Sequence, residues 1–120
     1  MARILVIDDE AGIRSFLRRV LEKAGHTVSE AADGRDGVRL VERDRPDLMI
    51  TDLFMPVQEG METIRAARQL RPDLKIVAIS GGGSQHIYDY LDSARLMGAD
   101  QALKKPLRAR IVLETVAALA

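Results

Sequence analysis

The chain has no cysteine, no tryptophan, few aromatic residues and no long apolar run, and each absence excludes a class of protein or site. Without cysteine it can form no disulfide, no thiolate metal site and no cysteine nucleophile, which fits a reducing cytoplasm. Because aromatic residues make up only 3%, we do not expect recognition of nucleic-acid bases by stacking. The first apolar run, residues 4–7, is too short for a signal-peptide core or a membrane span. We therefore expect a cytoplasmic protein that does not contact the membrane.

An excess of charge of either sign is also absent, since 18 lysine and arginine residues balance 18 aspartate and glutamate residues. A general nucleic-acid binder neutralises phosphates with a basic surface, so we expect no direct binding to nucleic acid. The length of 120 residues and the hydrophobic share of 47% indicate a single globular domain over residues 1–120.

Short apolar segments alternate with amphipathic helical segments along the chain. Strands are predicted at residues 4–7, 27–31, 48–51, 75–80 and 101–103. Five helices are predicted after them: one ending at Gly25, one capped by Asp33, one from Gly60 to near Pro72, one ending at Gly98, and one over residues 107–120. Strict alternation of this kind indicates a doubly wound α/β fold, in which helices cover both faces of a parallel sheet.

Polar residues follow several of these strands, and the carboxyl ends of parallel strands are where sites form in such sheets. They are Asp8 and Asp9 after the first strand, Asp52 after the third, Ser80 ending the fourth, and Lys104 and Lys105 after the fifth. Carboxylates brought together repel each other by on the order of several kcal/mol at low effective dielectric. A hard divalent cation with oxygen ligands removes that repulsion, and a carboxylate beside such a cation can act as a nucleophile in phosphoryl transfer.

Each of these residues, taken alone, also has a purely structural interpretation. Asp8 and Asp9 could cap the first helix, and Asp52 could be a turn residue before Pro56. The glycine run at residues 81–83 lacks the lysine and hydroxyl residue of a phosphate-binding P-loop, so we interpret it as a flexible loop.

Several short motifs occur together in this chain, and each is weak alone. They are Asp8-Asp9-Glu10, Asp52 with Met55-Pro56 and Gly60, Ser80, Gly98-Ala99-Asp100, and Lys105-Pro106. In combination they resemble the receiver domain of two-component response regulators over the whole chain. The resemblance implies a flavodoxin-like (βα)5 fold like that of chemotaxis receivers, with five parallel strands in the order 2-1-3-4-5. It also implies a signalling phosphoprotein that promotes only its own phosphorylation and autodephosphorylation, and not an enzyme.

The resemblance implies a phosphoacceptor and a metal site. Asp52 would accept the phosphoryl group. Mg²⁺, or Mn²⁺, would be bound by Asp9, Asp52 and the backbone carbonyl of Phe54, while Asp8 would act through water.

The resemblance also assigns the groups that contact the phosphoryl oxygens. Ser80 would donate a hydrogen bond, and Lys105 would supply positive charge. Composition does not decide between Lys104 and Lys105, but the family motif places its lysine directly before a proline and thereby selects Lys105, with a cis bond to Pro106. Receivers usually carry an aromatic residue three positions before this lysine, where this chain has Ala102. We therefore expect the glycine loop after the fourth strand to help transmit the state of the site.

The partners implied are a histidine kinase or a histidine phosphotransfer protein as phosphoryl donor, and a downstream protein that binds the surface of helix four, strand five and helix five. Three alternatives stay open at this point. The chain could be a receiver cut from a longer regulator with a DNA-binding or enzymatic output domain, or it could be a phosphate-shuttling intermediate. The third and weakest alternative is a flavodoxin-like binding domain or hydrolase.

Overall fold

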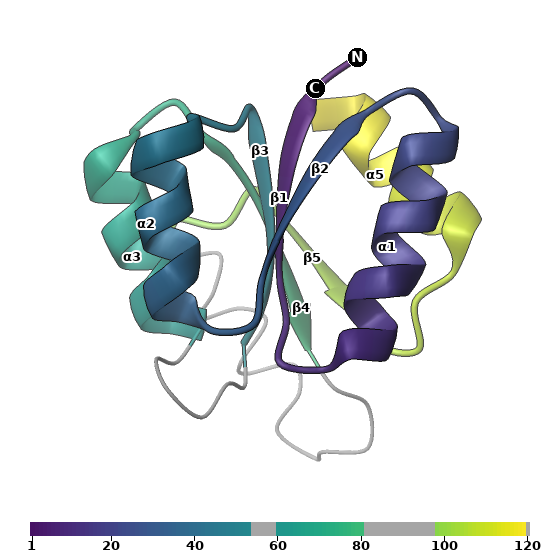
Figure 1. Ribbon diagram of the computed structural model, residues 1–120, viewed down its shortest axis with the longest axis horizontal. Coiled ribbons are helices and arrows are strands. Elements are labelled where there is room, and N and C mark those ends of the chain that lie inside the picture. Colours follow the sequence, from purple (N-terminus) through teal and green to yellow (C-terminus); the bar gives the residue numbers. More distant parts are fainter. Residues whose placement is uncertain (54–59, 81–97, 120) are drawn as a thin grey trace.

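The computed structural model describes residues 1–53, 60–80 and 98–119, in which a five-stranded sheet lies between two layers of helices (Figure 1). The strands are β1 (Arg3–Ile7), β2 (Thr27–Ala31), β3 (Leu48–Asp52), β4 (Lys75–Ser80) and β5 (Gln101–Lys104). All pairings are parallel, and the order is β2-β1-β3-β4-β5, so the predicted flavodoxin-like fold is confirmed.

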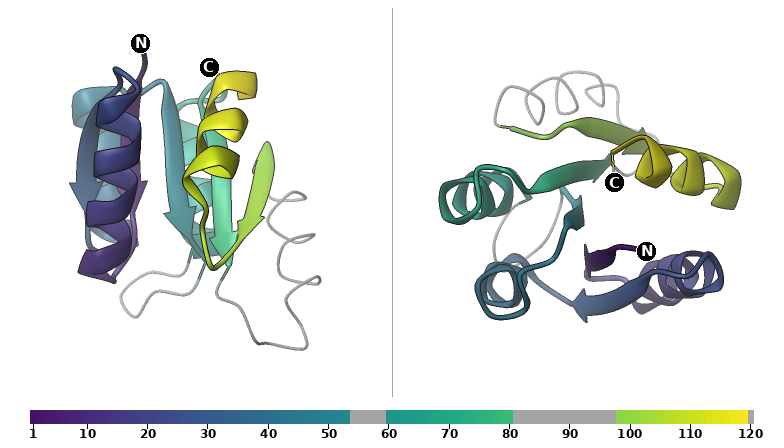
Figure 2. Two further views of the ribbon diagram at one scale, coloured as in Figure 1. Left: turned by 90° about the vertical axis from the view of Figure 1, so that its right-hand side faces the viewer. Right: turned by 90° about the horizontal axis from the view of Figure 1, so that it is seen from above.

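Four helices are described: α1 (Ala11–Lys23), α2 (Gly34–Asp44), α3 (Gly60–Leu70) and α5 (Ala109–Leu119). Helices α2 and α3 cover one face of the sheet, and α1 and α5 cover the other (Figures 1 and 2). The predicted fourth helix, the glycine loop at 81–83 and the turn with Phe54, Met55 and Pro56 lie outside the described residues.

Side chains of the central strands are buried on both faces, as their unbroken apolar runs predict. Leu5, Met49 and Ile76 face α2 and α3, where they pack with Ile64 and Leu74. Residues at the alternate positions of the same strands point the other way, toward α1 and α5. These are Ile4, Val6, Leu48, Ile50, Val77 and Ile79, packed with Leu17, Val112 and Val116. The two clusters hold the strands side by side, so that their carboxyl ends meet at one edge.

The ends of the helices follow the local sequence signals. Gly25 takes a left-handed conformation (φ 97°) after α1, and Asp33 caps α2 by accepting a hydrogen bond from the Asp36 N–H at 2.9 Å. Both predictions are confirmed. The last helix begins at Ala109, two residues later than predicted, because Arg108 is the cap residue whose carbonyl accepts the first helical bond, from Val112.

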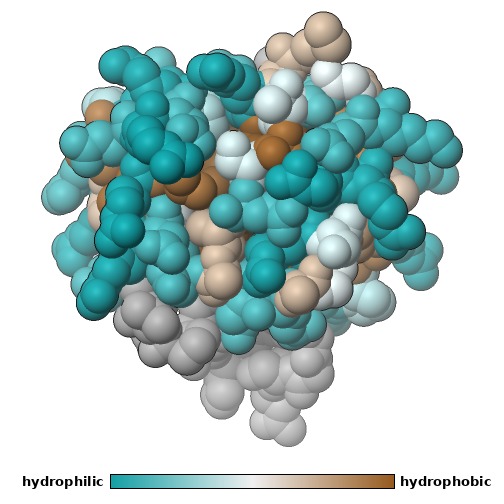
Figure 3. All heavy atoms as spheres, in the orientation of Figure 1, coloured by the Kyte–Doolittle hydropathy of each residue, from teal (hydrophilic) through white to brown (hydrophobic). Residues whose placement is uncertain are grey.

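Hydrophilic side chains cover most of the face shown in Figure 3, with smaller apolar areas between the elements. No helix in the described parts of the chain has the length and apolar character needed to cross a bilayer.

The loops before β4 and β5, at the opposite edge from the strand carboxyl ends, are joined by Arg68 of α3. Its guanidinium donates to the carbonyl of Leu74 at 2.5 Å and to the carbonyl of Gly98, and it pairs with Asp100 at 3.2 Å. Asp100 in turn accepts a hydrogen bond from the Ile76 N–H at 2.8 Å. One side chain therefore fixes the entry of two neighbouring strands.

Replacing Arg68 by alanine should lower the free energy of unfolding by about 2 kcal/mol or more, because hydrogen bonds from a charged donor to several backbone carbonyls are lost together. Urea unfolding followed by far-UV circular dichroism measures this. Arg110→Ala is the control, since the Arg110–Glu114 pair is exposed (85% and 60%) and should contribute less than about 1 kcal/mol. Equal losses in the two variants would contradict the structural role given to Arg68.

Candidate functional site

The carboxyl edge of the sheet brings together Asp8, Asp52 and Lys105. The register of β1 and β3 pairs Ile7 with Thr51, so the carboxylates that follow these residues lie next to each other. Lys105 follows β5, and its Nζ lies 3.2 Å from Asp8 Oδ2 and 3.6 Å from Asp52 Oδ2. One ammonium group therefore bridges two carboxylates that are remote in sequence.

The backbone of the fifth strand decides which of the two neighbouring lysines reaches the site. Lys104 pairs with Ser80 in the β4–β5 register, and its side chain is exposed. The next N–H, that of Lys105, donates to the Ser80 carbonyl at 2.8 Å. The side chain of Lys105 is 13% exposed and turns toward Asp8 and Asp52. The bond between Lys105 and Pro106 is cis, as predicted.

The site is buried, which makes its charges costly unless they are paired. Asp8 is 0% exposed, Asp52 3% and Ser80 0%. Burial lowers the pKa of Lys105, but the charges of Asp52 and Asp8 outweigh burial, so that the pKa lies above its ordinary value. The ammonium form is thus the form in which Lys105 holds the two carboxylates.

The surroundings compensate the charge of Asp8 less well than the charge of Lys105. Burial raises the pKa of the Asp8 carboxyl, although the Glu10 N–H and the Lys105 ammonium act in the opposite direction. Its Oδ1 accepts a hydrogen bond from the Glu10 N–H at 2.9 Å. Its Oδ2 is buried, lies 3.2 Å from Lys105 Nζ and, within the described part of the chain, makes no well-aligned hydrogen bond.

Carboxylate oxygens of Asp8, Asp9 and Glu10 lie within 4.8 Å of one another. Asp9 and Glu10 are exposed, and Glu10 Oε1 also lies 3.7 Å from Lys105 Nζ. The cap residue of α1 is Glu10, whose side chain makes no capping bond, so neither Asp8 nor Asp9 serves as the helix cap. Three clustered oxygens and a buried, incompletely bonded Asp8 Oδ2 fit a hard divalent cation.

The structure thus brings Asp8, Asp52 and Lys105 into contact, with Ser80 at the end of β4, as the sequence predicts. Asp9 lies with Asp8 and Glu10 in the oxygen cluster, and Asp52 is joined to that cluster through Lys105. The Phe54 carbonyl falls outside the described residues. Apart from its place directly after the two aspartates, Glu10 carries no sequence signal that predicts its position in this cluster.

Gly60, at the start of α3, passes very close to the backbone of Asp52. Its N–H donates to the Leu53 carbonyl at 3.1 Å. A Cβ at this position would lie 2.2 Å from the Asp52 carbonyl oxygen and 2.4 Å from the Leu53 Cα. Because both of these are backbone atoms at the end of a buried strand, only glycine fits here without moving Asp52.

Comparison with known proteins gives similarity along almost the whole chain. The family model described as Response regulator receiver domain matches residues 4–117. Response regulator MprA of Mycolicibacterium vanbaalenii is 37% identical over 118 residues, which are 98% of this chain and 49% of that protein. Protein CcdB of Bacillus subtilis is 34% identical over 117 residues, which are 97% of this chain and 95% of that protein. The chain spans about half the length of the MprA relatives and nearly all of Protein CcdB.

Solved structures agree with this similarity. A response regulator receiver domain protein from Clostridium thermocellum superposes with a TM-score of 0.91 at 30% identity, covering 99% of this chain and 94% of that one. Chemotaxis protein CheY4 of Vibrio cholerae gives a TM-score of 0.89 at 29% identity and covers 100% and 99% of the two chains.

The close approach of Gly60 gives a stability prediction. Gly60→Ala should lower the free energy of unfolding by roughly 1–3 kcal/mol or more, the scale of overpacking at a site that cannot relax. Gly12→Ala is the matched control, since nothing lies within 4 Å of a Cβ there. Because alanine favours helices, that change in α1 should stabilise the protein by up to about 1 kcal/mol. Urea unfolding of the two variants should move in opposite directions, and a neutral Gly60→Ala would contradict the geometry.

The poorly compensated charge of Asp8 gives a second prediction. A raised pKa means that the ionised carboxyl disfavours the folded state, so the contribution of Asp8 to stability falls as pH rises through its folded pKa and is constant above it. At pH 7 in EDTA, Asp8→Asn should therefore unfold at a higher temperature than the wild type, by roughly 4 °C if the gain is about 1 kcal/mol.

The higher unfolding temperature of Asp8→Asn should disappear at a pH below the ordinary pKa of an aspartate. There the wild-type carboxyl is protonated in both the folded and the unfolded state. Adding Mg²⁺ should stabilise the wild type and have a much smaller effect on Asp8→Asn. Thermal unfolding followed by circular dichroism, at pH 7 and below pH 4, with and without Mg²⁺, tests both statements. A less stable Asp8→Asn protein at pH 7 would show that Lys105 compensates Asp8 fully.

Proposed function

Because the chain belongs to the response regulator receiver domain family, we propose that it is switched by transfer of a phosphoryl group to Asp52. The observation that carries the proposal is the pairing of the buried Asp52 carboxylate with the Lys105 ammonium at the carboxyl end of β3. A nucleophile needs this combination of burial and nearby positive charge because phosphoryl transfer depends mainly on positioning and charge neutralisation. We propose a cytoplasmic signalling role without direct contact with nucleic acid or membrane.

In the proposed reaction, an oxygen of Asp52 attacks the phosphorus atom of a phosphohistidine on the donor protein. The bond between phosphorus and the imidazole nitrogen breaks, and its electron pair stays on that nitrogen, which then takes up a proton. Lys105 is already beside Asp52 and neutralises charge on the phosphoryl oxygens. Ser80, at the end of the neighbouring strand, donates its hydroxyl hydrogen to one of them.

The acidic side chains at this edge would hold the cation that the proposal requires. Asp9 and Asp52, with the Phe54 carbonyl, would bind Mg²⁺ or Mn²⁺, and Asp8 would act through water. The cluster of Asp8 with Asp9 and the incompletely bonded Asp8 Oδ2 support a cation beside these two residues, and Lys105 joins Asp52 to the same edge. A bound Mg²⁺ supplies further charge neutralisation at the phosphoryl oxygens.

We propose a histidine kinase or a histidine phosphotransfer protein as the donor, and a downstream protein as the reader of the phosphorylated state. The described part of the expected reading surface, on β5 and α5, is hollowed between Leu107 and Ile111. Ile111 is 42% exposed, and the cations Lys104 and Arg108 also line this hollow. An apolar centre with basic neighbours suits a partner segment that carries apolar and acidic side chains.

The similar proteins differ in length, and they suggest two settings in which this receiver could work. In one, the receiver acts alone, as the near-complete coverage of Protein CcdB suggests. In the other, it governs a further domain, as the half coverage of Response regulator MprA suggests. The phosphoryl chemistry proposed for Asp52 is the same in both.

Incubation with Mg²⁺ and a small phosphodonor such as phosphoramidate should add the mass of one phosphoryl group, labile in base and stable in mild acid, as expected of an acyl phosphate. Asp52→Asn should abolish the addition, because an amide cannot form the acyl phosphate. Asp73→Asn, which changes an exposed aspartate (82% exposed) far from the site, should be modified like the wild type. Absence of the added mass in the wild type, or its persistence in Asp52→Asn, would refute the proposal.

A further inference from the structure

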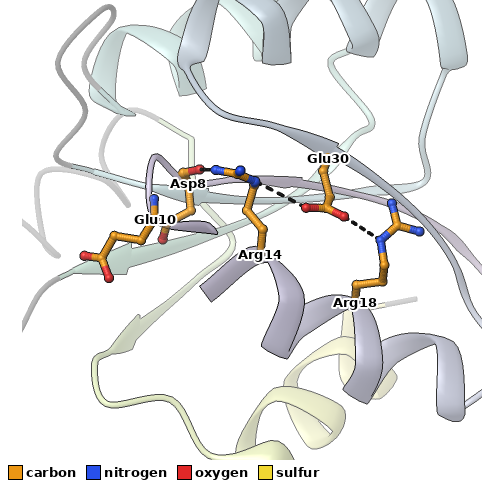
Figure 4. A network of polar contacts seen from close by, with 5 residues as sticks. All are labelled: Asp8, Glu10, Arg14, Arg18 and Glu30. Carbon is orange, nitrogen blue, oxygen red and sulfur yellow. Dashed lines mark hydrogen bonds and ion pairs between the residues drawn. The ribbon is translucent and has the colours of Figure 1, made fainter. Parts of the chain in front are cut away.

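A short network of ion pairs lies beside the cluster of Asp8, Asp9 and Glu10, on the α1 side of the sheet (Figure 4). Glu30 of β2 accepts a hydrogen bond from Arg14 Nε at 3.2 Å on one oxygen and from Arg18 Nε on the other. Arg18 also pairs with Glu22 at 2.9 Å. The Arg14 guanidinium, unlike that of Arg18, also donates to the backbone carbonyl of Asp8, at 2.7 Å.

That carbonyl lies where the chain leaves the sheet. β1 ends at Ile7, although the Asp8 N–H still donates to the Ala31 carbonyl of β2 at 3.1 Å. The Asp8 side chain is fixed by the Glu10 N–H at 2.9 Å. Among the contacts of the described residues, the bond from Arg14 is the one made to the Asp8 carbonyl, and it therefore fixes the orientation of the peptide between Asp8 and Asp9.

We propose that Arg14, held in place by Glu30, is a positioning residue of the cation site, because it fixes the peptide from which the Asp8 and Asp9 carboxylates both project. The proposal rests on the proposed function, since that function requires the cation. Arg14 touches neither the carboxylate oxygens of the cluster nor Asp52 in any contact of the described residues, so its effect is exerted through the backbone.

The charge of Arg14 and its positioning role predict opposite effects on Mg²⁺ affinity. As a cation near a cation site, Arg14 repels Mg²⁺, so removing its charge alone should tighten binding. Removing the support of a metal ligand instead weakens binding, by about 10- to 100-fold for groups that orient ligands. The sign of the change therefore separates the two roles without any measurement of phosphoryl transfer.

Isothermal titration of Mg²⁺ into the whole chain measures the effect. Arg14→Ala should raise the Kd for Mg²⁺ about tenfold, the lower end of that range. Arg18→Ala is the matched control, because it removes the other arginine from Glu30 but breaks no bond to Asp8. It should leave the Kd within about twofold, although it too removes ion pairs.

Glu30→Ala gives a second, independent route to the same result, since it removes the anchor of Arg14 and leaves the acidic loop unchanged in sequence. If Glu30 acts through Arg14, the double variant should bind Mg²⁺ as weakly as Arg14→Ala alone. Circular dichroism checks that each variant folds. Because loss of the Glu30 charge would by itself also weaken Mg²⁺ binding, the comparison of the double variant with Arg14→Ala carries the test of Glu30. If Arg14→Ala does not fold, Arg14→Met, which keeps the aliphatic part of the side chain, replaces it.

Unchanged or tighter Mg²⁺ binding in Arg14→Ala, with a wild type that does bind, would overturn the positioning role and leave the proposed function intact. A wild type that neither binds Mg²⁺ nor accepts a phosphoryl group would instead overturn the proposed function. Equal weakening in Arg18→Ala would show a general effect of the ion-pair network, and would also overturn the specific role of Arg14.

Discussion

The site depends on a single ammonium group placed between two buried carboxylates. Lys105 Nζ lies within 4 Å of both Asp8 and Asp52, which come from neighbouring central strands. Without this group, two buried negative charges would face each other at the carboxyl edge of the sheet, at a cost of several kcal/mol as an order of magnitude. The parallel sheet makes the arrangement possible because it brings the ends of β1, β3 and β5 to one edge.

The ammonium of Lys105 does not fully neutralise the carboxylates at this edge. Burial raises the pKa of Asp8, its Oδ2 is incompletely bonded, and the oxygens of Asp9 and Glu10 cluster beside it. A divalent cation would stabilise these carboxylates and, in the function we propose, would prepare the edge for an incoming phosphoryl group. Stability and the proposed function thus have opposite requirements here, and the two apolar clusters, one on each face of the sheet, supply the stability that the charged edge lacks.

Much of this architecture follows from local sequence. The apolar runs of β1, β3 and β4 predict buried parallel strands, and Gly25 and Asp33 mark helix ends through backbone conformation and side-chain capping. Periodicity does not show which lysine faces the site, since that depends on where β5 ends and how the chain turns, and the family motif was needed to select Lys105. The Arg14–Glu30 pair was missed because it joins a helix and a strand through side-chain directions that no one-dimensional pattern encodes.

The central claim is that the ammonium of Lys105, and not positive charge in general, activates this edge for phosphoryl transfer. The rate of phosphorylation by phosphoramidate in Lys105→Met and Lys104→Met tests it most directly, because the two variants lose the same charge at adjacent positions. Lys105→Met should be slowed by at least about tenfold, as expected when a preorganised charged donor is lost, and Lys104→Met should react like the wild type. Equal rates in the two variants would contradict the account.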